Sequence, residues 1–115
     1  MKSNENLIGL IRELKKKSID EKANIWKSIA LHLESPKQNR KTVNLYKIDK
    51  FSNGKEIIVV PGKVLGTGDV TKKINVYAFK FSQSALEKIN KNGKAGHIID
   101  LIKDKTKPSQ IRIIV

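Results

Sequence analysis

The first third of the chain has the apolar periodicity of two helices. In the first helix, apolar residues recur at intervals of three and four and share one face: Leu7, Ile8, Ile11 and Leu14. Asn4 is a suitable N-cap for this helix. Ser18 and Glu21 have the spacing of a capping box that starts a second helix, and Asp20 is an equally good cap. The pattern therefore predicts that the first helix ends at about Lys17.

The predicted second helix also has one apolar face. Its apolar positions are Trp26, Ile29, Ala30 and Leu33. Because the residue before a proline is forced out of the helical conformation, Ser35–Pro36 stops this helix at Leu33 or Glu34. The helical spacing favours a core position for the single tryptophan over a base-stacking role. Residues 1–34 are thus predicted to form a helical pair.

A change of pattern follows the helical pair. No acidic residue occurs between Ser35 and Ile48, and residues 36–42 contain no hydrophobic side chain. A stretch of three bases, two amides and a hydroxyl cannot pack a core, so residues 35–42 are predicted to form an exposed basic loop. A solvated linker is the alternative, but ordinary loops mix charges of both signs.

Residues 43–115 combine β-branched runs with short helical patterns. Residues 56–60 form a continuous β-branched run, which predicts a strand buried on both faces and ended by Pro61–Gly62. Further strands are predicted at 74–81 and 111–115, and a helix capped by Ser82 or Ser84 is predicted to end at Asn92–Gly93. Residues 43–48 fit a short strand that turns into a helix, and 97–103 fit a helix or a strand. These elements predict a single α/β domain spanning 1–115, with its α/β core at 43–115.

The positive charge of the chain is concentrated after residue 34. The formal net charge is +13 on 115 residues. Residues 1–34 hold seven bases and five acids, whereas residues 35–115 hold seventeen bases and six acids. Such an excess resists compaction unless a counter-charge is supplied, and nucleic-acid phosphate is a common source. Lysine outnumbers arginine 21 to 3, which favours phosphate contacts over bidentate reading of bases.

Few residues in the sequence suggest catalysis or metal binding. The chain has no cysteine, and its two histidines, His32 and His97, do not have metal-ligand spacing. No pair of carboxylates suggests acid–base chemistry. We therefore expect no catalytic residue, no metal and no cofactor. The first residues lack the apolar segment of a signal peptide, and no apolar run is long enough to span a bilayer, so we expect a cytoplasmic protein without a membrane partner.

The glycine-rich stretch 61–68 superficially resembles a phosphate-binding loop. A nucleotide loop requires its lysine after the last glycine and at a helix start, whereas Lys63 follows the first glycine here. The dinucleotide pattern also fails, since residue 71 is not glycine. A tight backbone path between two strands is the better interpretation, in which Gly62, Gly66 and Gly68 permit turns or close approach of the backbone to another chain or to RNA.

Seven basic residues and one asparagine in these loops and strands form the candidate RNA-binding set. It consists of Lys37, Asn39, Arg40, Lys41, Lys63, Lys72, Lys73 and Lys80. Since aromatic residues make up only 5% of the chain, stacking on single-stranded bases is not the expected mode of recognition. The composition instead favours recognition of a folded RNA through its shape and backbone.

Two segments in the middle of the chain resemble a known family. Residues 59–68, VVPGKVLGTG, and residues 74–82, INVYAFKFS, are similar to the central signature of the archaeal and eukaryotic large-subunit ribosomal protein L-eighteen-e, the counterpart of bacterial L-fifteen. Trp26, the loop from Pro36 to Arg40 and residues 43–45 fit the same family. The resemblance covers nearly the whole chain, and the length of the chain is similar to that of archaeal members.

The resemblance implies a fold and a function. It implies an N-terminal helical pair followed by an irregular superhelical core of strand–strand–helix turns. It also implies a cytoplasmic, structural place in the large ribosomal subunit, with ribosomal RNA and neighbouring ribosomal proteins as partners and no small-molecule substrate. The chain lacks the glycine- and arginine-rich N-terminal extension of the bacterial counterpart, so RNA contacts made by such an extension are not carried over.

Two other functions are compatible with parts of the sequence. A free-standing nucleic-acid-binding or compacting module would use the same excess of lysine. An enzyme acting on a small phosphorylated metabolite would use Lys63 and the glycines as an anion site, with Thr67 and Asp69 as the only local groups for chemistry. Binding to duplex DNA would favour the first, and a saturable thermal shift with nucleotides would favour the second.

Overall fold

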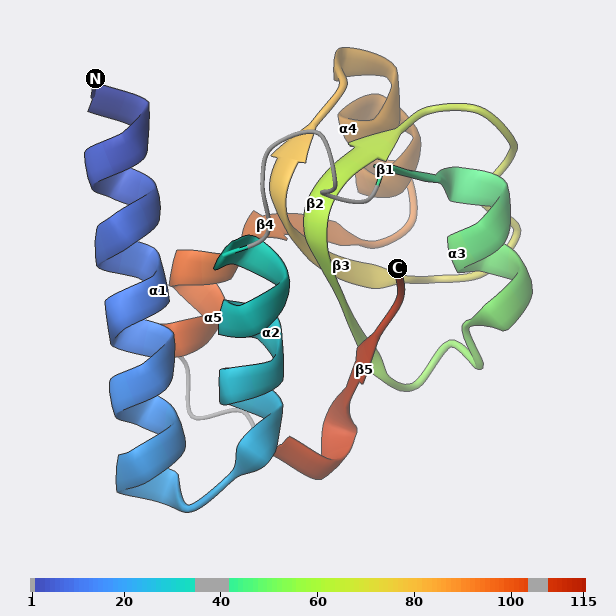
Figure 1. The fold of residues 1–115 in the computed structure, drawn as a ribbon. Helices are drawn as coiled ribbons and strands as arrows, with labels where there is room; N and C mark the ends of the chain where they lie inside the picture. The colour runs from blue at the N-terminus through green and yellow to red at the C-terminus, as the bar shows by residue number, and fades with distance from the viewer. Residues whose placement is uncertain (1, 35–41, 104–107) are drawn as a thin grey trace. The chain divides into compact units, whose positions relative to one another are not determined.

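The computed structural model describes residues 2–34, 42–103 and 108–115, which belong to two compact units (Figure 1). The first unit contains two packed helices, α1 (Lys2–Glu21) and α2 (Asn24–Glu34). The second unit contains a five-stranded sheet and three short helices. The α/β fold class and the N-terminal helical pair expected from the sequence are therefore confirmed.

The first helix is longer than the sequence pattern predicts, because it continues to Glu21. Its end is a Schellman-type turn in which the N–H of Lys22 donates to the carbonyl of Ile19 (3.3 Å) and that of Ala23 to the carbonyl of Ser18 (3.1 Å). Lys22 takes the left-handed conformation, with φ of 54°. The predicted capping box at Ser18 is wrong, since that residue lies inside α1. The sequence did not indicate this end because glycine, not lysine, usually marks such a turn.

The buried face of α1 is also rotated from the predicted one. Leu7, Leu10 and Leu14 are buried, whereas Ile8 is 55% exposed and Ile11 is half-buried. The apolar face predicted for α2 is confirmed. All four of its residues are fully buried: Trp26, Ile29, Ala30 and Leu33.

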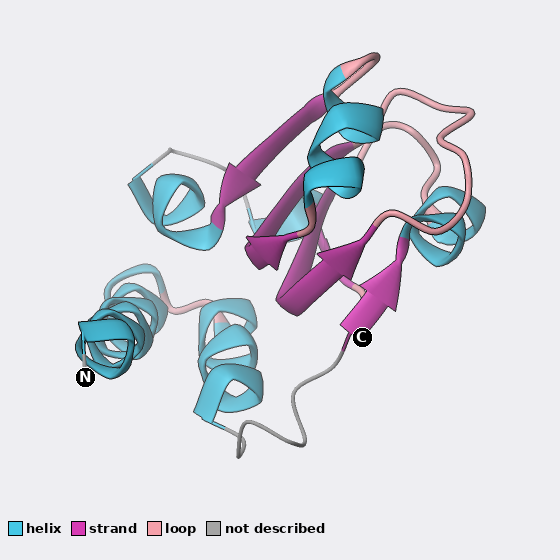
Figure 2. Cartoon of the chain, turned by 90° about the horizontal axis from the view of Figure 1, so that it is seen from above, coloured by secondary structure: helices cyan, strands magenta, loops and turns pink. Residues whose placement is uncertain are grey.

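Every strand pair in the sheet is parallel, and Figure 2 shows the strands side by side. The strands are β1 (Thr42–Asn44), β2 (Ile57–Leu65), β3 (Asn75–Phe81), β4 (Lys94–His97) and β5 (Ile111–Ile113). The order is β1-β2-β3-β4, and β5 also pairs with β2. The two short strands use different halves of β2, β5 at residues 57–59 and β1 at residues 63–65.

The helices of the second unit connect these parallel strands. They are α3 (Leu45–Phe51), α4 (Gln83–Asn90) and α5 (Ile98–Lys103), with a 3-10 turn at Pro108–Gln110. Ser82 caps α4, since its hydroxyl accepts from the N–H of Ala85 at 3.2 Å. Residues 42–51 thus form a short strand that turns into a helix, and residues 98–103 are helical. Strand β4 was not predicted, because Lys94–His97 lacks a β-branched pattern.

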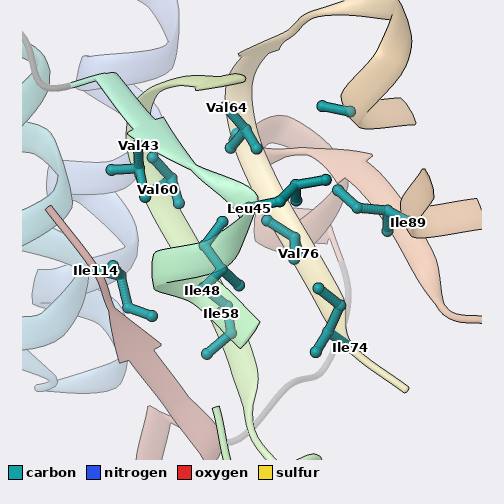
Figure 3. Packing of buried hydrophobic residues seen from close by; sticks show 12 residues of the cluster. Val43, Leu45, Ile48, Ile58, Val60, Val64, Ile74, Val76, Ile89 and Ile114 are labelled. Atoms are coloured by element: carbon teal, nitrogen blue, oxygen red, sulfur yellow. The ribbon is translucent and has the colours of Figure 1, made fainter. Parts of the chain in front are cut away.

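The core of the second unit lies between the sheet and helices α3 and α4 (Figure 3). Leu45 and Ile48 from α3, and Ala85 and Ile89 from α4, are fully buried. They pack with residues on one face of the strands: Val43, Ile58, Val60, Val64, Val76 and Ala78.

Strand β2 does not end at Pro61–Gly62, in contrast to the prediction. Its register against β3 shifts there, from Val60 opposite Ala78 to Lys63 opposite Lys80. A bulge is one of the few places in a strand where proline's missing N–H is tolerated. The strand therefore continues through the bulge to Leu65, and Lys63 becomes part of the sheet.

Candidate nucleic-acid interface

Two of the predicted RNA-binding lysines are paired across the sheet. Lys63 on β2 and Lys80 on β3 are register partners, and both side chains are exposed. Because residues directly opposite each other on neighbouring strands project from the same face, the two lysines lie side by side on one face of the sheet. Adjacent strands lie about 4.8 Å apart, which brings two positive charges close together. Thr42 on β1 extends the same row, as the partner of Lys63 on its other side.

This lysine pair is not neutralised within the described part of the chain. No carboxylate in that part forms an ion pair with either ammonium group. The Lys80 ammonium lies 5.8 Å from the centre of the Phe79 ring, which leaves its charge in place. Like charges directly opposite each other destabilise a sheet. An anionic group that binds both ammonium groups would remove this repulsion.

Lys72, in contrast, is used inside the fold. Its ammonium donates to the carbonyls of Asp49 (2.7 Å) and Ser52 (2.9 Å) at the end of α3. The Asp49 carboxylate in turn accepts from the N–H and hydroxyl of Thr71, at 2.9 and 2.7 Å, and from the N–H of Lys72 at 3.2 Å. This network of hydrogen bonds connects α3 to the loop before β3.

The network also changes the acidity of Asp49. Partial burial acts to raise its pKa, but the hydrogen bonds from Thr71 and the Lys72 backbone, with the Lys72 charge, outweigh burial and lower the pKa below its ordinary value. A lowered folded-state pKa means that ionised Asp49 stabilises the fold above the unfolded-state pKa. That stabilisation is lost as the pH falls through the folded-state value.

Replacing Asp49 with alanine is therefore expected to destabilise the protein in a pH-dependent way. Hydrogen bonds to a charged group contribute about 1.5–3 kcal/mol, which is the loss expected at pH 7. Urea unfolding of the wild type and of Asp49→Ala, measured at neutral and at strongly acidic pH, gives the two stability differences. The difference should narrow in acid, and an equal difference at both pH values would show that the ionised carboxylate does not stabilise the fold.

The glycine-rich loop presents carbonyl groups to a lysine of its own chain. The Lys88 ammonium donates to the carbonyls of Gly66 and Gly68, both at 2.8 Å. A phosphate loop presents N–H groups to an anion instead. The glycines permit close packing within the chain, since a Cβ on Gly66 would lie 2.9 Å from the N of Ala85. Sequence reasoning did not identify Lys88, because nothing near it in the sequence indicates its acceptors.

The other predicted RNA-binding residues fall into two groups. Lys73 is exposed in the loop that precedes β3. Lys37, Asn39, Arg40 and Lys41, with most of the predicted basic loop, lie outside the described residues. In sequence, Lys41 directly precedes Thr42, the register partner of Lys63.

The sequence pattern places the lysine triplet 15–17 in the last turn of the first helix. In the structure the triplet lies inside α1, before its last turn. Lys15 forms an ion pair with Glu34 of α2, and Lys17 forms one with Glu21 at 2.7 Å. The Lys17 ammonium also lies 4.9 Å from the centre of the Trp26 ring. The hydrogen bond from Lys17 lowers the pKa of Glu21 below its ordinary value, against the opposing effect of desolvation. Two of the three lysines thus link parts of the helical pair.

The described residues lack two kinds of feature, a metal-binding cluster and a membrane-spanning helix. Among them, no group of three or more His, Asp or Glu side chains is arranged to hold a metal ion. No helix in the described ranges is both long enough and apolar enough to cross a bilayer.

Comparison with known proteins identifies the family. A family model that describes the ribosomal proteins 50S-L15 and 50S-L18e, together with their 60S counterpart, matches residues 16–95. Three similar curated proteins share the name "Large ribosomal subunit protein eL18". The one from Methanothermobacter thermautotrophicus is 50% identical over 92 residues, which cover 80% of this chain and 76% of the relative.

Two relatives align with almost the whole chain. The protein from Archaeoglobus fulgidus is 41% identical over 115 residues, 99% of this chain and 98% of the relative. The protein from Halobacterium salinarum is 36% identical over 114 residues, 98% of this chain and 97% of the relative. These relatives are ribosomal proteins and not enzymes. The resemblance seen in the sequence is thereby confirmed, and the chain belongs to this family of ribosomal proteins.

Proposed function

We propose that this protein is a structural constituent of the large ribosomal subunit that stabilises folded ribosomal RNA through phosphate contacts. The observation that carries the proposal is the exposed, in-register pair of Lys63 and Lys80. A phosphate group that bridges two neighbouring strands would remove the repulsion between the ammonium groups. Neighbouring ribosomal proteins complete the expected set of partners.

The proposed surface extends from this lysine pair. Thr42 continues the row on β1, and the acid-free segment that contains Lys37, Asn39, Arg40 and Lys41 directly precedes this residue in the sequence. Lys73 belongs to the proposed surface as an exposed residue. Lys72 contributes chiefly to the fold, because two of its three donors are already used.

Co-sedimentation with ribosomal subunits tests the proposed function. A tagged copy of the protein, expressed in cells, should sediment with large subunits and remain there after a high-salt wash. Recovery mainly with small subunits, or in the unbound fraction at low salt, would contradict the proposal.

A competition experiment separates the proposal from a free-standing DNA-compacting role. Purified protein bound to deproteinised large-subunit RNA is challenged with increasing amounts of duplex DNA of random sequence. The proposal predicts that the duplex competes poorly on a per-phosphate basis. Equal competition by the duplex would favour the compacting module.

A further inference from the structure

Tyr46 is an exposed aromatic residue whose backbone is fixed from outside its own helix. Its side chain is 57% exposed in the first turn of α3. Leu45 and Ile48 of the same helix point into the core (Figure 3). A single exposed ring needs no explanation by itself, but the backbone of this residue is held by contacts outside its helix and a lysine lies nearby.

The glycine-rich loop holds the backbone of Tyr46. The N–H of Tyr46 donates to the carbonyl of Thr67 at 3.1 Å. Gly68 has φ of +104°, and a Cβ there would lie 2.6 Å from the Cβ and 2.7 Å from the N of Tyr46. The loop is itself held by Lys88, which binds two of its carbonyls. The position of the aromatic residue is therefore set before any ligand arrives.

This residue lies at the edge of the sheet where parallel strands end. Tyr46 follows the carboxyl end of β1, and the loop that contacts it follows the carboxyl end of β2. Ligands of open α/β sheets bind at this edge. Lys63 lies two residues before the end of β2, at the same edge of the sheet.

One exposed lysine lies on the same helix as Tyr46. Lys50 lies one turn further along α3, at i+4, and is exposed. Its ammonium is 5.6 Å from the centre of the Phe51 ring, which is 44% exposed. An exposed aromatic ring with a lysine one helical turn away matches a nucleotide, which has a π-face on its base and a negative charge on its phosphate.

From these observations we infer that Tyr46 is a stacking platform for one unpaired base of ribosomal RNA, with Lys50 beside the phosphate. The inference rests on the proposed function and adds a second mode of contact to the phosphate contacts of the lysine pair. Because the backbone of Tyr46 is already fixed, only the side chain loses freedom when a base stacks on it. The low aromatic content had argued against stacking in general, but it does not exclude one well-placed residue.

Variants of Tyr46 test the inference through RNA binding. Affinity for deproteinised large-subunit RNA is measured by filter binding at several salt concentrations for the wild type, Tyr46→Leu, Tyr46→Phe and the matched control Phe51→Leu. Loss of one stacked base should weaken binding roughly tenfold in Tyr46→Leu without changing the salt dependence. Tyr46→Phe and Phe51→Leu should bind like the wild type.

The other outcomes overturn the inference in distinguishable ways. Wild-type affinity of Tyr46→Leu would exclude stacking and leave the proposed function intact. An equal loss in Tyr46→Phe would assign the contact to the hydroxyl instead of the ring. If Tyr46→Leu binds RNA normally but no longer retains a neighbouring ribosomal protein in assembled subunits, the residue is part of a protein interface. Failure of the wild type to bind the RNA would instead contradict the proposed function itself.

Discussion

Replacing Lys63 and Lys80 together by glutamine is expected to weaken binding to large-subunit RNA roughly 25- to 60-fold near 0.1 M salt. Each neutralised phosphate contributes about 0.7–0.9 to the slope of log affinity against log salt concentration. Loss of two contacts should therefore reduce the slope by about 1.4–1.8. Over the tenfold range from 1 M down to 0.1 M salt, this slope corresponds to the roughly 25- to 60-fold loss of affinity. Filter binding over a series of salt concentrations measures both quantities.

A control variant with the same change of net charge makes this test specific. Lys16 and Lys27 are exposed lysines of the helical pair, where bases and acids are nearly balanced. Glutamine at both positions should change the affinity and the slope much less than glutamine at Lys63 and Lys80. Equal effects of the two double variants would mean that net charge, and not the lysine pair, determines binding.

The stability of the Lys63 and Lys80 variant provides a second criterion. Because the two ammonium groups repel each other across neighbouring strands, their removal should leave the thermal midpoint unchanged or slightly raised. Replacing a residue that stabilises the fold would lower the thermal midpoint instead. A marked drop in the midpoint would show that these lysines stabilise the sheet.

Replacing Gly93 with alanine is expected to cost about 3 kcal/mol or more of folding free energy. A Cβ at this position would lie 2.9 Å from both the C and the N of Ile74 and would also meet its carbonyl oxygen. These are backbone atoms at the start of β3, so no side chain can move to relieve the clash, and the N–H of Lys94 already donates to the same carbonyl at 3.0 Å. Chemical denaturation measures the loss.

The same substitution at Gly9 is expected to have the opposite sign. Gly9 lies inside α1, and a Cβ there would meet nothing within 4 Å. Alanine should stabilise the helix by about 0.5–1 kcal/mol, because glycine is a poor helix former. A destabilising effect of Gly9→Ala, or a neutral effect of Gly93→Ala, would show that these backbone environments are described incorrectly.

The sequence predicted the main elements of the fold where the hydrophobic pattern was local. The β-branched run at 57–60, the strand ending at Phe81 and the buried face of α2 were predicted correctly, and the cap of α4 is Ser82, one of the two serines predicted for it. In each case, side chains within one element determine the structure of that element. The family resemblance supplied the ribosomal identity, which residue patterns alone did not provide.

The errors arose where distant contacts or backbone conformation decide the structure. The left-handed conformation of Lys22 extends α1 past the predicted end, and the register shift at Pro61–Gly62 carries β2 past the predicted stop. Lysine rarely marks such a helix end, and a Pro–Gly pair is compatible with the end of a strand as well as with a bulge. Strand β4 forms because β3 offers a free edge, although its own sequence is a weak strand former.

The candidate site, like the fold, could be predicted only where the local sequence determines the structure. Lysine content and the acid-free segment indicated a phosphate-binding surface, but they did not indicate which lysines the fold itself uses. Lys72 and Lys88 bind backbone carbonyls of their own chain, whereas Lys63 and Lys80 face outward together. That distinction depends on pairings between strands and loops that are far apart in the sequence.

A cryo-electron microscopy structure of the large subunit that contains this protein tests the central claim most directly. The proposed function predicts that the ammonium groups of Lys63 and Lys80 lie within roughly 4 Å of phosphate oxygens of the ribosomal RNA. Both lysines facing solvent or carboxylates of another protein would contradict it, as would the absence of the protein from the subunit.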